Sequence, residues 1–249
     1  MVFKKKLRME NFPKIAAREE MGKPDISKRM VYDMKPVLMR AEKVIKNEIY
    51  YTVFRNLKIV GGKARYDITQ IPQNKIAGEL AKTFGHYHKS AYPELYEVLD
   101  GRAYFLLQKF SNNPTEISEA YIVEAEAGEK AVMPPGFGHL SINIGGGDLI
   151  LANWISLVEY DYQLFSKFHG GCYYVLNKGE NIEFEKNPNY KSVPELKKLK
   201  LRDLPDLGIK NDKERPIWDL YKTPEKLDWL VNPEKYMDLL TIEKLYREI

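Results

Sequence analysis

Short apolar runs separated by turn-forming residues fill the middle of the chain. From Asn47 onward, Tyr, Val, Ile and Phe recur in runs that are bounded by Gly, Pro, Asn and Asp. This pattern is typical of β-strands joined by turns. The runs that predict strands are Ile49–Phe54, Ala64–Ile71, Leu95–Leu99, Ala103–Lys109, Ala120–Val123, Ala131–Met133, Leu140–Ile144, Asp148–Trp154 and Cys172–Leu176. Many short strands at close spacing predict a mainly β fold, an antiparallel sandwich or barrel.

The first part of the chain lacks this strand pattern. Residues 1–45 are charged and mixed, with one short helix expected around Pro13–Met21 and another stretch near Val37–Lys46. We interpret them as an arm on a β domain over residues 46–178. The remaining residues, 179–249, are charged and proline-spaced, and we expect a partly helical extension that packs on the β domain.

The end of this extension has helical spacing. Asn232 is suited to cap a helix, and Pro233 fits its first turn. Four apolar residues follow at helical spacing and give the expected helix one apolar face: Leu239, Ile242, Tyr246 and Ile249. Packing of this face on the chain's own domain is favoured over a partner-binding role.

Composition narrows the class of protein. Of 249 residues, 44% are hydrophobic and 30% are charged, which suits one globular domain with extensions. The net charge of +4 is spread without a basic tract, so no nucleic-acid partner is expected. The longest apolar run, Leu149–Ile155, is far below the roughly 20 residues that cross a bilayer, so no membrane partner is expected. The lack of a signal segment after the basic start and a single cysteine, Cys172, predict a cytoplasmic location.

Three of the four histidines stand where strands could bring them together. His86 and His88 are separated by one residue on an expected strand, so both imidazoles face the same side. Glu94 begins the next strand after a turn, and His139 follows the turn-forming residues 134–136. Three imidazoles and one carboxylate suit a divalent first-row metal. A His-x-His pair alone, however, is more often a polar or hydrogen-bonded pair than a ligand set.

Strand alternation and expected turns also decide which nearby polar residues are not metal ligands. Glu97 lies three residues from Glu94 and faces the opposite side of the strand, whereas Tyr96 shares the side of Glu94. His169 is expected in a turn, either exposed or bonded to backbone. The glycines at 145–147 predict a hairpin turn, because no helix follows them to bind phosphate.

The spacing of these residues resembles the two-part signature of the cupin family. The matching positions are His86, His88, Glu94 and Gly101 in the first part, and Gly128, Pro134, Gly136, His139 and Asn143 in the second. Cupins are antiparallel jelly rolls, in agreement with the strand pattern. Within the cupins, the local sequence resembles the cupin-type glucose-6-phosphate isomerases. The segments that carry this resemblance are Lys82–His88, Pro93–Gly101, Pro134–His139 and Asn143–Gly145, with weaker similarity at Asp67–Thr69, Arg29, Asp33–Met34 and Asp161–Tyr162.

This resemblance implies a metal-dependent aldose-ketose isomerase that interconverts glucose 6-phosphate and fructose 6-phosphate in glycolysis and gluconeogenesis. It implies one divalent ion per subunit, Fe2+ first and Mn2+, Ni2+, Co2+ or Zn2+ as alternatives. The implied metal ligands are His86, His88, Glu94 and His139, and the implied catalytic residues are Glu94 and Tyr162. The family's phosphosugar contacts fall on Tyr50, Thr69, Thr83, Gly85 and Tyr96. Open sheet edges and the arm predict a homodimer.

Some features keep other interpretations open. Trp154 stands in place of a family tyrosine and Tyr160 in place of a family histidine, which affects the substrate contacts but not the metal ligands. Lys82 either adds charge to a phosphate site or is a solvated side chain. The same ligand set suits a cupin oxygenase with Fe(II), or a sugar-binding cupin without catalysis. Within an isomerase, Glu94 could move a proton, or the hydrogen could move as hydride.

Overall fold

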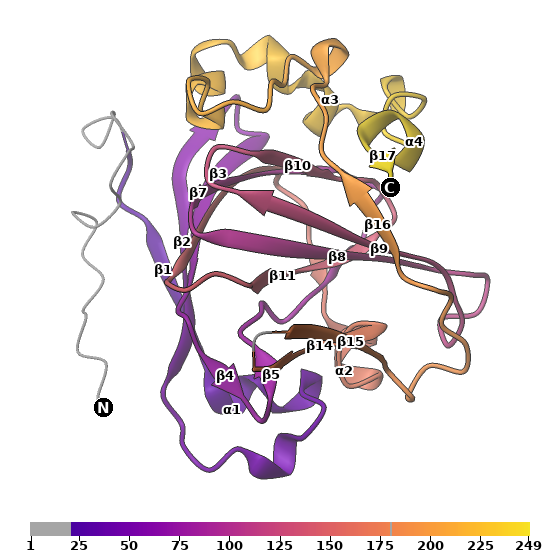
Figure 1. The fold of residues 1–249 in the computed structure, drawn as a ribbon. Coiled ribbons are helices and arrows are strands. Elements are labelled where there is room, and N and C mark those ends of the chain that lie inside the picture. The colour runs from indigo at the N-terminus through magenta and orange to yellow at the C-terminus, as the bar shows by residue number, and fades with distance from the viewer. Residues whose placement is uncertain (1–20, 180) are drawn as a thin grey trace.

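Two β-sheets face each other and form the body of the protein (Figure 1). The computed structural model describes residues 21–179 and 181–249, so the helix expected around Pro13–Met21 lies, apart from Met21, outside the described residues. Each predicted strand overlaps an observed one, and the predicted mainly β, cupin-type fold is confirmed. Within the described part of the chain, no helix combines the length and apolar character needed to span a membrane.

The first sheet is antiparallel and carries Glu94, one of the four predicted ligands. Its six strands lie in the order β1 (Asp25–Met30), β2 (Ile49–Val60), β3 (Ala64–Ile71), β12 (Leu149–Ser156), β7 (Glu94–Asp100) and β10 (Lys130–Met133). The central strands β3, β12 and β7 have long buried runs, because apolar side chains cover both of their faces.

The second sheet has five strands and packs across the first. Their order is β11 (Gly138–Asn143), β8 (Arg102–Phe110), β9 (Ile117–Glu126), β16 (Lys197–Lys200) and β17 (Arg247–Glu248). The glycines at 145–147 connect β11 to β12, which lie in different sheets. They therefore form a turn as predicted, but the turn does not close a hairpin.

Smaller elements cover one end of the two sheets. A four-stranded sheet contains β4 (Lys75–Ile76), β5 (Glu79–Leu80), β14 (Tyr173–Lys178) and β15 (Asn181–Lys186), and a two-stranded ladder joins β6 (Tyr87–His88) to β13 (Tyr160–Asp161). The short helices are α1 (Val31–Met34), α2 (Gln163–Lys167), α3 (Asp228–Val231) and α4 (Ile242–Leu245). Figure 1 shows α1 and α2 at the end opposite to α3 and α4.

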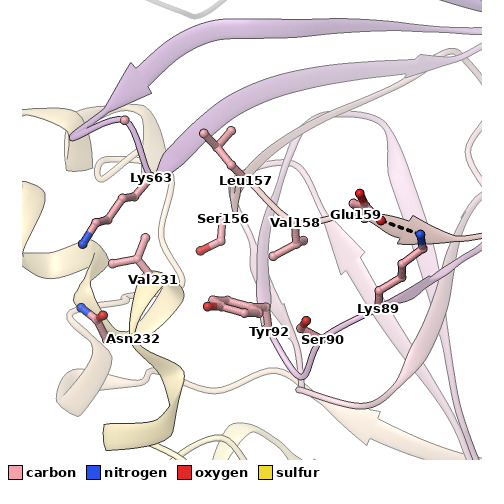
Figure 2. A pocket seen from close by; sticks show the side chains of 11 residues that line it. Lys63, Lys89, Ser90, Tyr92, Ser156, Leu157, Val158, Glu159, Val231 and Asn232 are labelled. Atoms are coloured by element: carbon pink, nitrogen blue, oxygen red, sulfur yellow. Dashed lines mark hydrogen bonds and ion pairs between the residues drawn. The ribbon is translucent and has the colours of Figure 1, made fainter.

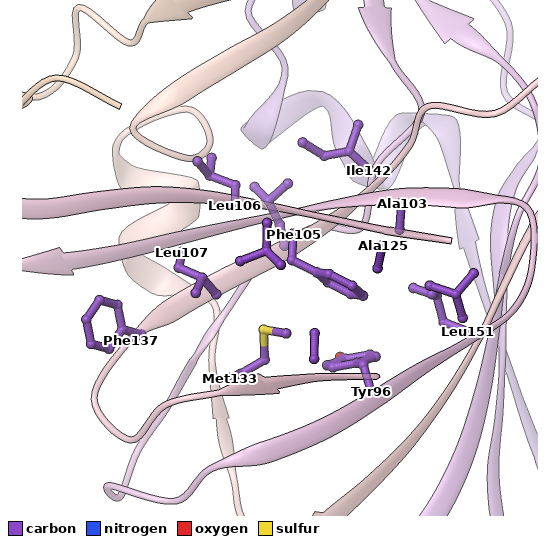
Figure 3. Close-up of a cluster of buried hydrophobic side chains, with 14 of the residues drawn as sticks. Tyr96, Ala103, Phe105, Leu106, Leu107, Ala125, Met133, Phe137, Ile142 and Leu151 are labelled. Carbon is purple, nitrogen blue, oxygen red and sulfur yellow. The ribbon is translucent and has the colours of Figure 1, made fainter. Parts of the chain in front are cut away.

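Apolar side chains from the two sheets interlock between them (Figure 3). Phe105 on β8 lies opposite Met133 on β10 and Leu151 on β12, and all three are almost completely buried. Burying a side chain of this size contributes about 1.5–3 kcal/mol relative to leaving it exposed. This core fixes how the two sheets sit, and with them the side chains on the strands around the candidate site.

The N-terminal residues do not simply trail from the body. Residues 25–30, which the sequence assigns to the arm, form edge strand β1 and pair antiparallel with β2. The stretch near Val37–Lys46 contains short 3₁₀ turns at Lys35–Val37 and Ala41–Lys43. The division into arm, β domain and extension remains a prediction, with β1 adding a strand to the β body.

The prediction of a single helix after Pro233 is wrong. The chain makes a 3₁₀ turn at Pro233–Lys235, then the short α4, and then extends into β17. Tyr246 is buried and donates a hydrogen bond from Oη to the Val132 carbonyl (2.6 Å), while Ile249 is 70% exposed. Pairing of β17 with β16 requires extended backbone, so these tertiary contacts override the local helical spacing.

Candidate metal centre

Strand alternation in the first sheet turns a row of polar side chains toward the interior. Asn153 on β12 lies between Asp67 on β3 and Tyr96 on β7 in the strand register, so these three residues share one face. Glu94 lies two residues before Tyr96 and faces the same way. The sheet therefore presents a carboxylate beside the polar groups that could orient it.

Four predicted ligands come together at this face. The ligand atoms of His86, His88, Glu94 and His139 all lie within 4.8 Å of one another. Two backbone hydrogen bonds tie His86 to His139, from His86 N to His139 O (3.1 Å) and from His139 N to His86 O (3.0 Å). Only residues 87 and 88 of the expected His-x-His strand are strand, yet the rings of His86 and His88 remain neighbours, with centroids 5.3 Å apart. We call these four residues the His/Glu cluster.

One carboxylate oxygen is the centre of the cluster. Glu94 Oε2 lies 3.7 Å from His86 Nε2, 3.3 Å from His88 Nε2 and 3.1 Å from His139 Nε2. A hydrogen bond on the side of the His88 ring away from Glu94 fixes its orientation: Nδ1 donates to the Tyr92 carbonyl over 2.7 Å. This hydrogen bond leaves the lone pair of His88 Nε2 directed at Glu94.

The donor set fits a divalent cation. His86 Nε2 is buried and has no hydrogen-bond partner among the described residues. Ring-nitrogen lone pairs that face a carboxylate oxygen repel one another unless a cation or protons lie between them. Three imidazole nitrogens and one carboxylate oxygen are a ligand set that first-row divalent ions accept.

The ionisation of these groups supports the same interpretation. Burial, together with the neighbouring His139, lowers the pKa of His86 to about 3, so its imidazole is neutral at pH 7. Burial alone would raise the pKa of Glu94, but without an ion the hydrogen bonds that protonated ring nitrogens of the three imidazoles donate outweigh it and hold this pKa well below its usual range. A neutral imidazole and an ionised carboxylate are the forms that bind metal.

A second residue positions the Glu94 carboxylate. Asn153 is buried and donates a hydrogen bond from Nδ2 to Glu94 Oε1 over 2.8 Å. This bond holds one carboxylate oxygen and leaves the other to the imidazoles. The sequence contained a signal for this role, because Asn153 is the polar residue that interrupts the apolar run Leu149–Ile155.

A small cavity opens beside the cluster, and we call it the central cavity. His86 and Glu94 of the cluster line it, together with five further residues expected at the site from sequence: Thr69, Thr83, Gly85, Tyr96 and Tyr162. Side chains that the sequence did not single out as contacts also line it: Tyr51, Val53, Arg55, Asp67, Phe84, Asn153 and Tyr160. The cavity therefore joins a candidate metal centre to a set of hydroxyl groups.

Two arginines share one carboxylate at the edge of this cavity. Asp67 accepts from Arg65 Nε (3.0 Å) and Arg55 Nη1 (3.3 Å) on the same Oδ2 atom. Arg65 Nη2 also donates to Tyr160 Oη (2.7 Å). The Tyr160 ring in turn lies against His86, with centroids 4.1 Å apart. This ionic group is thus held beside the His/Glu cluster.

Comparison with known proteins assigns the family. A model of the glucose-6-phosphate isomerase (GPI) family matches residues 28–192. The chain belongs to this family. Glucose-6-phosphate isomerases of Thermococcus gammatolerans and Thermococcus litoralis are each 29% identical to it, over 131 and 132 residues. Each match covers 52% of this chain and 66% of the relative, just under two thirds of the relative's length.

Solved structures give weaker matches. An oxalate oxidase in complex with glycolate has 15% identity and a TM-score of 0.34, covering 45% of this chain and 51% of that chain. The oxalate decarboxylase formate complex of Lactobacillus farciminis has 20% identity and a TM-score of 0.35, covering 48% of this chain and 32% of that chain. These values are too low to bear on function.

One family contact expected from sequence lies elsewhere. Tyr50 does not line the central cavity; its hydroxyl accepts a hydrogen bond from the Lys82 amide (3.0 Å). Its neighbour Tyr51 lines the cavity instead, because successive residues of a strand face opposite sides. Lys82 is neither solvated nor in the cavity, since its side chain is buried in an ion pair with Glu79.

The two family departures differ in their consequences. Trp154 is fully buried and donates from Nε1 to the Ile217 carbonyl (2.7 Å), so it faces the extension rather than the cavity. Tyr160, by contrast, lines the cavity. The change from histidine to tyrosine at that position therefore alters the cavity wall, whereas the change to Trp154 does not.

The residues excluded from the ligand set stay outside it. Glu97 is buried on the other face of β7, where Oε2 accepts a hydrogen bond from the Ile217 amide (2.8 Å). Burial raises the pKa of Glu97 to about 7. His169 is exposed in a turn with φ of +55°, and its amide donates to the Ser166 carbonyl (3.3 Å).

A larger hollow lies on the other side of the His88–Glu94 loop (Figure 2). Its volume is about 790 Å3, and it separates this loop from the C-terminal extension at Val231 and Asn232. Its one carboxylate, on Glu159, is paired with Lys89 at 2.5 Å. No histidine or cysteine lines it, so it is not a second metal centre of the His/Glu type.

Proposed function

We propose that the protein is a metal-dependent aldose-ketose isomerase that interconverts glucose 6-phosphate and fructose 6-phosphate. The observation that carries the proposal is the convergence of three imidazole nitrogens on Glu94 Oε2 beside a cavity with hydroxyl groups. Membership of the glucose-6-phosphate isomerase family over residues 28–192 supports the choice of substrate. The proposed metal ligands are His86, His88, Glu94 and His139.

Glu94 has two proposed roles, metal ligand and general base. A divalent ion bound there supplies Lewis-acid polarisation of the substrate carbonyl. Asn153 holds Glu94 Oε1, so Oε2 is the oxygen that would bind the ion. Because a bound cation lowers the basicity of a carboxylate, Oε2 would have to leave the ion to take a proton from C2 and return it to C1. In the alternative route the hydrogen moves between the two carbons as hydride, and Glu94 serves only as a ligand.

Hydroxyl groups around the cavity are suited to orient a phosphosugar. The Ser141 amide donates to Thr83 Oγ1 (3.0 Å), which leaves the Thr83 hydroxyl proton free to bond a ligand oxygen. Burial raises the pKa of Tyr96 and of Tyr162, so both phenols keep their protons at neutral pH and act as donors. Thr69 and Gly85 complete the proposed contacts, and Tyr162 is proposed to lie against the reacting part of the sugar.

The remaining assignments follow from the ligand set and the fold. We propose Fe2+ as the ion, with Mn2+, Ni2+, Co2+ or Zn2+ as alternatives, because imidazole and carboxylate suit all of them. The exposed edge strand β1 supports the proposal of a homodimer. The proposed setting is glycolysis and gluconeogenesis in the cytoplasm.

Metal reconstitution tests the function. The purified protein is stripped with a chelator, reloaded with single divalent ions, and assayed for conversion of fructose 6-phosphate to glucose 6-phosphate. Activity should disappear on stripping and return with at least one ion. Folded protein that stays inactive with every ion contradicts the proposal.

Two other outcomes identify the alternative functions. Oxygen consumption by the iron-loaded protein, without isomerisation, indicates a cupin oxygenase. Binding of phosphosugar without turnover indicates a sugar-binding cupin. Both are measured on the same reloaded samples.

A further inference from the structure

The charge of a phosphosugar is not balanced by the residues that line the central cavity. Among the described lining residues, the one permanent cation is Arg55, and it shares Asp67 with Arg65. The hydroxyls of Thr69 and Thr83 offer hydrogen bonds but no charge. A phosphate monoester carries nearly two negative charges at pH 7, and charge-assisted hydrogen bonds are about twice as strong as neutral ones.

Arg29, whose guanidinium is unpaired among the described residues, brings a positive charge to the side of the cavity lined by Phe84 and Tyr162. It lies on β1 opposite Tyr51 of β2, so its side chain shares the face of a cavity residue. The guanidinium carbon is 5.0 Å from the centroid of the Phe84 ring and 5.8 Å from that of Tyr162, and both rings line the cavity. The Arg29 guanidinium has no hydrogen bond or ion pair with any residue in the described part of the chain, although the residue is partly buried.

The backbone beside Arg29 is also open to an anion. Gly85 adopts φ of +84°, and a Cβ there would lie 2.5 Å from the Phe165 ring, so only glycine fits. Its amide donates no hydrogen bond to another described residue. A free backbone N–H, the Thr83 hydroxyl and a guanidinium placed over aromatic rings are complementary to phosphate oxygens.

We propose that Arg29 binds the phosphate group of the substrate, together with the Thr83 hydroxyl and the Gly85 amide. This inference rests on the proposed function and makes Arg29 a specificity residue, one that distinguishes phosphorylated from free sugars. It also gives edge strand β1 a role, because β1 brings the charge to a cavity built by other strands. Arg55 and Arg65, which share Asp67, instead support Tyr160 beside the His/Glu cluster.

The test compares Arg29→Gln and Arg29→Lys with Lys28→Gln in the metal-loaded protein. Lys28 lies on the same strand, is exposed and faces away, so its substitution removes one positive charge without touching the cavity. Loss of a charge-assisted phosphate contact should raise KM for fructose 6-phosphate about 10- to 100-fold with little change in kcat. Arg29→Lys should retain part of the affinity, and Lys28→Gln should match wild type.

Binding of inorganic phosphate, followed by titration calorimetry, separates this inference from the isomerase proposal. Wild type should bind phosphate, and Arg29→Gln should lose this binding. Any inhibition by unphosphorylated fructose should be equal in wild type and Arg29→Gln. An active Arg29→Gln enzyme with unchanged KM and phosphate affinity overturns the inference and leaves the isomerase intact. Loss of phosphate affinity in Arg55→Gln but not in Arg29→Gln also overturns it.

Phosphate binding and isomerase activity can also be lost separately. Phosphate binding that depends on Arg29 in a wild-type protein without isomerase activity supports the anion site and rejects the proposed function. If Arg29→Gln does not fold, the comparison rests on Arg29→Lys, whose charge is kept while the planar fork is lost. A wild type that binds neither phosphate nor phosphosugar overturns the inference.

Discussion

Asn153 donates a hydrogen bond to Glu94 Oε1 over 2.8 Å, and the side chains of both residues are buried. The bond joins two neighbouring strands, β12 and β7, directly behind the His/Glu cluster. It restricts the carboxylate to one orientation and directs Oε2 at the three imidazoles. The relationship makes Asn153 a positioning residue for the proposed metal centre.

Substituting Asn153 by Ala should weaken metal binding without removing a ligand. Residues that orient metal ligands typically change affinity by about 10- to 100-fold when they are replaced. The affinity is measured by competition with a chelating dye at fixed pH. Asn153→Asp is the matched comparison, because it places a second carboxylate beside Glu94 in a buried site. An unchanged affinity in Asn153→Ala would show that the hydrogen bond does not position Glu94.

Substituting Glu94 by Gln distinguishes the two routes of hydrogen transfer. If Glu94 is the base, turnover should fall by about 100-fold or more, because Gln accepts no proton. If hydride moves, the loss should be smaller and should follow metal occupancy. Rates are therefore divided by the metal content of each sample, and exchange of the transferred hydrogen with deuterated solvent is measured on wild type. Solvent exchange supports the proton route.

The buried Glu97 should make stability depend on pH. Its pKa is about 7 in the folded protein and near 4.5 as the unperturbed value, so between these values the folded state binds more protons than the unfolded chain. Stability from this group is thus present at about pH 4.5 and is lost as pH rises through 7. Relative to Glu97→Gln, wild type should lose unfolding free energy between pH 5 and pH 8. Denaturant melts at several pH values measure this, and parallel pH profiles would contradict the assignment.

Substituting Gly85 by Ala should disturb the cavity as well as the backbone. The added Cβ would lie 2.5 Å from the Phe165 ring at a φ of +84°, so steric overlap adds to backbone strain. Gly62→Ala is the control, because φ is +65° there and nothing lies within 4 Å of the added atom. Gly85→Ala should therefore lose more stability than Gly62→Ala, by about 1–3 kcal/mol. It should also raise KM, whereas Gly62→Ala should not.

Local patterns were sufficient to predict the strands and to group His86, His88 and Glu94. Alternation of apolar and polar residues depends on neighbours two positions apart, and this information lies within each segment. The same is true of the spacing from His86 to Glu94, which one turn and two strand ends accommodate. His139 is far away in sequence, but the family pattern supplied its pairing with the others.

Registers between distant strands could not be read from the sequence in the same way. Successive residues of a strand face opposite sides, and the packing of the sheet decided that Tyr51 rather than Tyr50 lines the cavity. The helix expected after Pro233 failed for a related reason, because pairing of β17 with β16 depends on contacts outside the segment. Propensity within the segment does not contain these contacts.

The sequence by itself determined the fold class, the grouping of His86, His88 and Glu94, and the exclusion of Glu97, because each depends on periodicity or spacing over a few residues. The family pattern in the same sequence added His139. Only the tertiary structure decided which polar groups surround them. The bond from Asn153 to Glu94 and the position of Arg29 above Phe84 join segments about 55–60 residues apart. Such contacts are set by how the two sheets pack, and packing is a property of the whole chain.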